Sequence, residues 1–249
     1  MNTEQTIKKM RVLKLVGMAD AYQTICELPL DKQPVLDQVI AQIIEAEELD
    51  RLHRKTLSAI KQARFRYQST IEEITTTEDR NLSKNLLYKL AETSFIRMGE
   101  NVIITGATGC GKSFIATALG YQACQMGCRV AYYSLPKLLQ RLHLAKADGS
   151  YIKELSKLEK YQLLILDDWG IQPLDANARL AIMQIIEDRH GKAATIITAQ
   201  MPVTKWHEYI ADPALADAIL DRVLSQAHRI ELKGNSMRKN TNTNNNSNT

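Results

Sequence analysis

The spacing of apolar residues divides the chain into two differently patterned regions. From Thr6 to about Ile71, apolar residues recur every three or four positions among Glu, Lys and Gln, which predicts helices. Pro34 stands where a new helix can begin, ahead of an apolar stripe that needs a packing partner. The stripe consists of Val35, Leu36, Val39, Ile40, Ile43 and Ile44. We therefore expect a small all-helical domain over residues 1–71.

Beyond residue 82 the pattern changes to short apolar runs that alternate with longer helical stretches, which is typical of βαβ units. The apolar runs predict strands at Val102–Ile104, Val130–Tyr133, Leu163–Leu166, Thr195–Thr198 and Arg229–Leu232. The expected fold class is α/β, with a parallel five-stranded sheet between helices over residues 83–239. Residues 72–82 interrupt the helical pattern and are interpreted as a linker. The tail, 240–249, contains only Asn, Thr and Ser and is expected to be disordered.

One loop carries the phosphate-binding motif G-x-x-x-x-G-K-[ST]. It consists of Gly106, Ala107, Thr108, Gly109, Cys110, Gly111, Lys112 and Ser113, and it lies between an apolar strand and a helical run from Phe114 to Gln125. Gly109 and Gly111 permit the φ values that turn backbone amides toward phosphate oxygens. Lys112 is expected to reach the β- and γ-phosphates, while the Ser113 hydroxyl ligates Mg²⁺. The motif and its flanking elements, Phe114 included, predict binding of ATP with Mg²⁺.

Two other predicted strands end in polar residues at the edge where ligands of parallel sheets collect. Asp167 and Asp168 follow the third strand, so Asp167 is expected to hold Mg²⁺ and Asp168 to orient or deprotonate the attacking water. Asp168 is one methylene shorter than the usual Glu. Alternatively, the pair only ends a strand and caps a helix. Thr198 and Gln200 follow the fourth strand and either sense the γ-phosphate or only satisfy the backbone before Pro202.

Composition adds few restrictions. The net charge of +4 is mildly basic, which permits a polyanionic partner without requiring one. The four cysteines show no CxxC pairing, so we interpret them as reduced thiols rather than as metal ligands or disulfides. No apolar run approaches the ~18 to 20 residues that cross a bilayer, and the N-terminus lacks the apolar core of a signal peptide. We expect a cytoplasmic protein that does not enter membranes.

A basic stretch from residue 51 to 71 contains no acidic residue and has Phe65 and Tyr67 interleaved. Six unopposed charges suit a phosphate backbone, although they cover a wide arc of a helix. A solvated helix, or one that faces an acidic partner, is the alternative. Because no base-reading motif is present, contacts with a nucleic acid are expected at its phosphates rather than at its bases. The cations are Arg51, Arg54, Lys55, Lys61, Arg64 and Arg66.

Over nearly its whole length the chain resembles the IstB-like transposition helper ATPases, relatives of the DnaC-type replicative helicase loaders in the initiator branch of AAA+ proteins. The resemblance rests on Gly17-Met18-Ala19, Arg80-Asn81-Leu82, Asn101-Val102, the run from Leu166 to Gly170, the run from Leu215 to Arg222 and the run from His228 to Leu232. It agrees with the strand count and the polar end of the fourth strand, from which we infer the additional strand that an AAA+ core has between the phosphate-loop and Asp167 strands. It also implies ATP-dependent oligomerisation on duplex DNA and recruitment of the cognate transposase.

The resemblance assigns roles to several further residues. Arg222 aligns with the arginine finger that reaches a neighbouring subunit's γ-phosphate, although it could be a surface arginine paired with Asp221 or Asp217. Arg238 resembles another arginine of this group, and only about ten residues follow it, too few for the usual helical lid. The expected helix from residue 135 to 158 corresponds to one that faces DNA in initiator-type relatives. Its cations are Lys137, Arg141 and Lys146.

Three alternative functions share the phosphate loop. A replicative helicase loader would differ mainly in its N-terminal helices. A small-molecule kinase would need a substrate pocket and an arginine-bearing lid, for which the sequence shows no candidate. A non-hydrolysing scaffold would use ATP only to hold the assembly on DNA, with Asp168 too short to act as a base.

Overall fold

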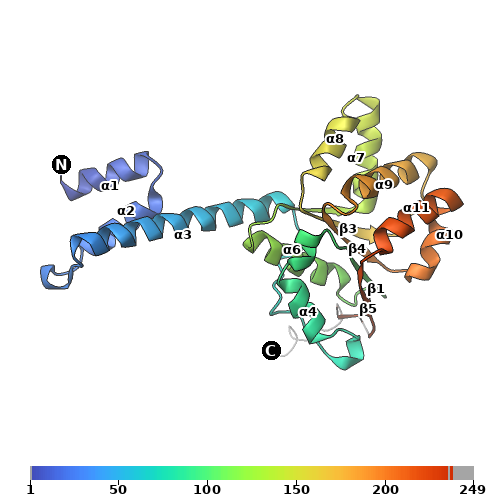
Figure 1. The fold of residues 1–249 in the computed structure, drawn as a ribbon, viewed down its shortest axis with the longest axis horizontal. Coiled ribbons are helices and arrows are strands. Elements are labelled where there is room, and N and C mark those ends of the chain that lie inside the picture. Colours follow the sequence, from blue (N-terminus) through green and yellow to red (C-terminus); the bar gives the residue numbers. More distant parts are fainter. Residues whose placement is uncertain (1, 235, 238–249) are drawn as a thin grey trace, which may run out of the picture. The chain divides into compact units, whose positions relative to one another are not determined.

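The computed structural model describes residues 2–234 and 236–237, which fold as two compact units divided between Ser58 and Ala59 (Figure 1). The predicted tail, 240–249, and Arg238 lie outside the described residues. The expectation of no helical lid concerns the same region. Within the described ranges, no helix is both long enough and apolar enough to span a bilayer.

The first unit is helical. It contains α1 (Thr3–Val12), α2 (Val16–Cys26), a short 3-10 turn (Leu30–Lys32) and most of α3 (Leu36–Ala63). Gly17 allows α2 to approach α3 closely, because a Cβ there would lie 2.4 Å from the Ala46 carbonyl oxygen. This contact explains the glycine of the Gly17-Met18-Ala19 motif.

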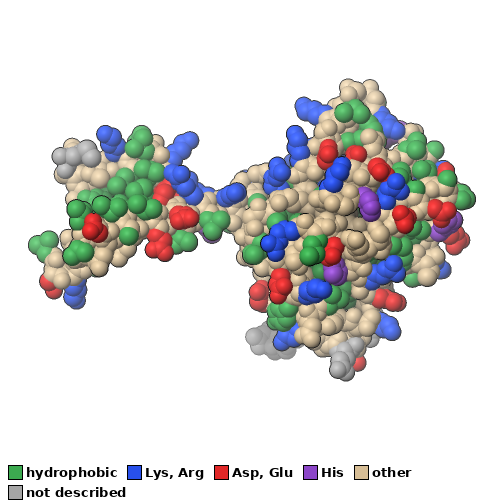
Figure 2. Space-filling model, viewed as in Figure 1, with side chains coloured by type: hydrophobic (Ala, Val, Ile, Leu, Met, Phe, Trp, Pro, Cys, Tyr) green, Lys and Arg blue, Asp and Glu red, His purple; other side chains and the backbone are tan. Residues whose placement is uncertain are grey.

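The apolar stripe predicted for this unit is largely uncovered. Ile43 is buried, whereas Val35, Leu36, Ile40 and Ile44 are exposed. Figure 2 shows hydrophobic side chains gathered over this unit. Among the described residues of this unit, α2 approaches α3 closely at Gly17, yet most of the stripe stays exposed, so these residues do not supply the packing partner expected for it.

The second unit contains a parallel sheet in the order β2-β3-β4-β1-β5, which confirms the predicted α/β fold class. Strand β4 lies between β1 and β3, as the additional strand of an AAA+ core does. The strands are β1 (Val102–Gly106), β2 (Val130–Ser134), β3 (Leu163–Trp169), β4 (Ala194–Ala199) and β5 (His228–Leu232).

Helices cover both faces of this sheet, because successive apolar residues of each strand point to opposite sides. On β1, Val102 and Ile104 belong to one core and Ile103 to the other. The first core includes α4 (Lys84–Ala91), α5 (Ser94–Met98) and α6 (Lys112–Gln125) (Figure 1). The second includes α7 (Leu135–Ala147), α8 (Tyr151–Glu159), α9 (Ala176–Arg189), α10 (Trp206–Ile210) and α11 (Pro213–Leu224).

Two local features differ from the sequence predictions. The helix expected from residue 135 to 158 is broken between α7 and α8, where Gly149 has a φ of +78°. Residues 59–82, assigned to the helical domain and the linker, belong to the second unit. Ile71, Ile74 and Leu82 are buried in its core, and this burial fixes the segment against the sheet.

Candidate nucleotide-binding site

The phosphate loop joins β1 to α6 and depends on glycine conformations. Gly109 and Gly111 have φ values of +84° and +95°, and α6 begins at Lys112. Loop amides and the positive end of this helix therefore face the same space, which suits a phosphate group. The Lys112 ammonium group donates hydrogen bonds to the carbonyl oxygens of Gly106 and Ala107, each at 2.8 Å. It must turn from these carbonyls to reach a phosphate.

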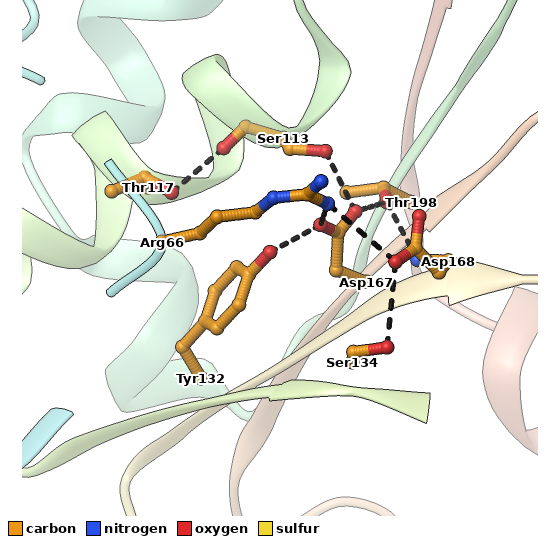
Figure 3. A network of polar contacts seen from close by, with 8 residues as sticks. All are labelled: Arg66, Ser113, Thr117, Tyr132, Ser134, Asp167, Asp168 and Thr198. Carbon is orange, nitrogen blue, oxygen red and sulfur yellow. Dashed lines mark hydrogen bonds and ion pairs between the residues drawn. The ribbon is translucent and has the colours of Figure 1, made fainter. Parts of the chain in front are cut away.

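Asp167 lies at the centre of the polar network in Figure 3, buried to 1% exposure. Its Oδ1 accepts a hydrogen bond from Ser113 Oγ at 2.8 Å and another from the Thr198 hydroxyl. Its Oδ2 accepts one from the Tyr132 hydroxyl. Mg²⁺ prefers oxygen ligands and usually takes only one or two from the protein. The adjoining oxygens of Ser113 and Asp167 fit that requirement.

Asp168 occupies a different environment from its neighbour. Its backbone has a φ of +67°, an unusual conformation for aspartate, and its amide donates to Thr198 Oγ1 at 3.4 Å. Its carboxylate accepts a hydrogen bond from Ser134 Oγ at 3.4 Å. Burial raises the pKa of Asp168, and the nearby Asp167 charge raises it further. A raised pKa is what a carboxylate needs to accept a proton from water.

The polar end of β4 faces the same site from the other side. The Thr198 hydroxyl donates to the Asp167 carboxylate and accepts a hydrogen bond from the Asp168 backbone amide, so it contacts both aspartates. Gln200 accepts a hydrogen bond from the Thr108 hydroxyl of the phosphate loop at 2.9 Å. Both candidate sensors therefore contact nucleotide-site residues in addition to their backbone neighbours.

These residues line a cleft of about 770 Å³. Its other wall comes from residues 66–80, which the sequence had indicated only as basic stretch and linker. Arg80 reaches across this wall and donates to the Cys110 carbonyl oxygen at 2.8 Å. Phe114 and Met237 also line the cleft, and the Met237 amide donates to the Gly109 carbonyl oxygen at 3.0 Å.

Sequence reasoning missed Tyr132, Ser134 and Arg80 as members of the site. The Arg80-Asn81-Leu82 motif was a signal for one of them, although the sequence assigned it no role. The other two lie at the carboxyl end of β2, directly beside β3 in the sheet. Knowledge of the strand order would have indicated them.

Arg222 lies on α11 and is not among the residues that line the cleft. Its Nε forms an ion pair with Glu187 Oε2 at 2.5 Å rather than with either aspartate considered from the sequence. Asn101, just before β1, donates from its side-chain amide to the carbonyl oxygens of Arg222 and Val223, at 3.3 and 3.2 Å. Its side-chain oxygen accepts from the Thr195 amide at 3.0 Å.

The candidate DNA-binding cations fall into separate groups. The interpretation of six unopposed charges was wrong for Arg51 and Arg54, which pair with Glu47 and Asp50 one turn earlier, each at 2.7 Å. In the second unit, Arg141 pairs with Glu154 at 2.7 Å. Lys146 donates to Asn177 and lies over the Tyr151 ring. Arg66 lies at the nucleotide cleft. The exposed remainder is Lys55, Lys61, Arg64 and Lys137.

A phosphate loop after β1, paired carboxylates after β3 and the polar strand β4 between them define a P-loop nucleotide-binding protein of the AAA+ class. The chain belongs to the family described as IstB-like ATP binding protein, whose model matches residues 8–245.

Its relatives carry names that refer to insertion sequences. The chain is 40% identical over 235 residues to y4pL of Sinorhizobium fredii, named as an insertion sequence ATP-binding protein, which covers 94% of this chain and 96% of that one. It is 30% identical over 226 residues to the ATP-binding protein of insertion sequence IS21 from Pseudomonas aeruginosa, covering 91% and 85%.

Among solved structures, the DnaC helicase loader matches with a TM-score of 0.55 and 21% identity over 66% of this chain and 97% of that one. The replication initiator DnaA bound to AMPPCP and single-stranded DNA matches with a TM-score of 0.56 and 17% identity, covering 69% and 52%. These likenesses concern the fold.

Proposed function

We propose that this protein is a Mg²⁺-dependent ATPase that assembles on duplex DNA and helps the transposase of its insertion sequence to use target DNA. The observation that carries the proposal is the position of Arg222. The residue that resembles the arginine finger lies outside its own nucleotide cleft. A complete site then requires a second subunit, and hydrolysis depends on assembly.

The polar residues described at the cleft, together with Arg222 of a neighbour, divide the steps of this reaction among them. The loop amides and Lys112 bind the phosphates, and Ser113 with Asp167 would hold Mg²⁺. Held there, the ion would supply positive charge against the charge that develops on the phosphate oxygens. Asp168 orients the attacking water and accepts its proton, while Thr198 holds the Asp167 carboxylate and the backbone of Asp168 in place. Arg222 of a neighbouring subunit then stabilises the transferred phosphoryl group.

Contacts with DNA are assigned to the exposed cations, principally Lys55, Lys61, Arg64 and Lys137. Side chains of this kind bind phosphates without reading bases, so affinity should fall steeply with salt and vary little with sequence. Relatives named for insertion sequences favour a transposase as the partner over a replicative helicase. The likeness to DnaC supports only the shared fold.

The first test is the ATPase rate as a function of protein concentration, with and without duplex DNA. We expect the rate per subunit to rise steeply with concentration and with DNA, because each site needs a neighbour. Lys112→Ala should abolish nucleotide binding and serves as the background. Sizing with a non-hydrolysable ATP analogue should show large DNA-bound assemblies.

Other results would separate the alternatives. A constant rate per subunit that ignores DNA would contradict the proposal and favour a small-molecule kinase. DNA-bound assemblies that form with ATP but never hydrolyse it would instead support the scaffold function. Assembly on a replicative helicase, with no effect of the transposase, would support a helicase loader.

A further inference from the structure

The segment that follows α3 is fixed to the nucleotide core on both sides of Arg66. Phe65 packs against Gly120 of α6 so closely that a Cβ on that glycine would lie 2.7 Å from the ring. Ser69 is buried, and its hydroxyl donates to the Phe114 carbonyl oxygen at 3.2 Å. Both contacts are with the helix of the phosphate loop. The backbone of Arg66 is therefore held at a defined place relative to that loop.

The side chain of Arg66 extends from this anchored segment toward the ends of β2 and β3 (Figure 3). One guanidinium nitrogen lies 3.7 Å from Asp167 Oδ2 and 3.6 Å from Asp168 Oδ2. The guanidinium carbon is 5.5 Å from the centre of the Tyr67 ring. Arg66 also lines the cleft together with Lys112 and Ser113. Its positive charge is thus directed at the nucleotide site.

The negative charges in the cleft explain why a cation is favourable at this position. Asp167 and Asp168 present two carboxylates at the point that a terminal phosphate must approach, and like charges repel in a partly buried site. A cation that contacts both acids offsets this repulsion. The planar guanidinium has five N–H donors, so it can contact a carboxylate and still offer donors to a phosphate oxygen.

We propose that Arg66 binds the γ-phosphate of ATP within its own subunit and makes the cleft prefer ATP over ADP. This inference rests on the proposed ATPase function and adds a second arginine to it, one that acts in cis while Arg222 acts in trans. It also removes Arg66 from the set of candidate DNA contacts. ADP lacks the group that Arg66 contacts, so the residue contributes to ATP binding alone.

The test compares ATP and ADP affinity, measured by calorimetry with Mg²⁺ and without DNA, in the full chain and its variants. Arg66→Ala should weaken ATP binding by about tenfold or more, the usual effect of a hydrogen bond to a charged group, and leave ADP binding unchanged. Arg66→Lys should recover part of the loss, because the charge remains but the fork is absent. Lys89→Ala removes an exposed charge on α4, far from any assigned role, and should change neither affinity.

Three results would overturn the inference. Equal losses of ATP and ADP affinity in both Arg66 variants would show that the residue only supports the cleft wall. Tighter ATP binding by Arg66→Ala would show that the arginine competes for the carboxylates instead of assisting the phosphate. Unchanged ATP affinity in Arg66→Ala, with normal binding by the parent chain, would exclude any contact. Absence of ATP binding by the parent chain would instead contradict the proposed ATPase function.

Discussion

At the scale of single residues, the buried Asp167 carboxylate depends on its hydroxyl donors. Ser113, Tyr132 and Thr198 each donate to it, and Tyr132 comes from a neighbouring strand that the phosphate-loop motif does not include. A hydrogen bond to a charged group contributes about 1.5 to 3 kcal/mol. Loss of one donor should therefore disturb the orientation of the carboxylate that is proposed to hold Mg²⁺.

Tyr132→Phe removes this hydroxyl and preserves the ring. We expect the Mg²⁺ concentration for half-maximal ATPase rate to rise by about tenfold, in line with the loss of one such hydrogen bond. A Mg²⁺ titration of the ATPase rate measures the effect. Tyr133→Phe is the matched control on the same strand and should leave the Mg²⁺ requirement unchanged. Equal Mg²⁺ curves for Tyr132→Phe and the parent chain would exclude a role for the hydroxyl.

Cys124 offers a pH-dependent test of the core that packs against α6. Burial raises the pKa of its thiol from an ordinary value of 9.0 to about 12. The folded chain therefore keeps the thiol protonated where the unfolded chain ionises it. This stability is fully present below pH 9.0 and is lost as pH rises toward 12, by about 1.4 kcal/mol per pH unit.

Chemical unfolding at pH ~8 and pH ~10 should show this loss in the parent chain. Cys124→Ala has no ionisable group at that position, so its free energy of unfolding should fall less between the two pH values. Tyrosines with raised pKa values contribute equally to both proteins and cancel in the comparison. An equal fall in the free energy of unfolding of the parent chain and of Cys124→Ala would mean that the thiol is accessible to solvent.

Sequence reasoning predicted a common site for Lys112, Ser113 and Asp167, because a contiguous motif or strand end marks each of them, and all three line one cleft. It could not place Tyr132 and Arg66 beside Asp167. The hydroxyl of Tyr132 meets Asp167 only through the pairing of β2 with β3, which is not written in either segment. Arg66 looked like one member of a basic stretch, because charge alone does not show which way a side chain points.

At the scale of elements, α6 shows how packing overrides local preference. Gly120 lies inside this helix, where alanine would normally be more stable by about 1 kcal/mol. A Cβ there would, however, lie 2.7 Å from both Ile165 Cδ1 and Phe65 Cε1. The glycine therefore permits the phosphate-loop helix to approach the sheet and the Arg66 segment at once.

Gly120→Ala should consequently destabilise the protein, by about 1 to 3 kcal/mol, despite its higher helix propensity. Chemical unfolding measures this difference. We also expect weaker ATP binding, since movement of Phe65 displaces Arg66. An increase in stability would show that the segment does not pack on α6 in solution.

The strands were the most predictable elements, because four of the five are short apolar runs and β5 alternates polar and apolar residues. All five are where the sequence placed them, and the buried β1, β3 and β4 show why continuous apolar runs mark a parallel sheet covered on both faces. The segment from residue 59 to 82 was harder to interpret. Beyond the end of α3, its core residues Ile71, Ile74 and Leu82 do not continue one apolar period, so they suggest no single regular element.

At the scale of the whole molecule, the proposed role of Arg222 predicts that ATP hydrolysis requires residues from two neighbouring subunits. Arg222→Ala retains a nucleotide site but offers no finger, whereas Asp168→Asn offers the finger but lacks the proposed base. Each variant alone should bind ATP and show little hydrolysis. An arginine finger contributes a factor of about 10³ to 10⁵ in rate, so the loss should be large.

Mixing the two inactive variants on duplex DNA should restore hydrolysis. Sites in the Arg222→Ala subunits would receive the finger of an Asp168→Asn neighbour. The ATPase rate across mixing ratios measures this complementation and should be greatest for comparable amounts of both. No recovery at any ratio, with assembly intact by sizing, would show that Arg222 acts in its own subunit or not at all.

Asn101 connects the two parts of a subunit that would face different neighbours in such an assembly. Its side chain joins the main chain of Arg222 to Thr195 of β4, and Asn101 itself directly precedes β1, the strand that leads into the phosphate loop of the same subunit. The residue offered to the next site and the loop that holds the local nucleotide are thus parts of one connected unit. In an open row of subunits, the last site at one end would receive no finger and would keep its ATP longest. The two ends of a row would then differ in bound nucleotide, with ATP retained longest at one end. A row assembled on a symmetric stretch of DNA would therefore have two distinguishable ends.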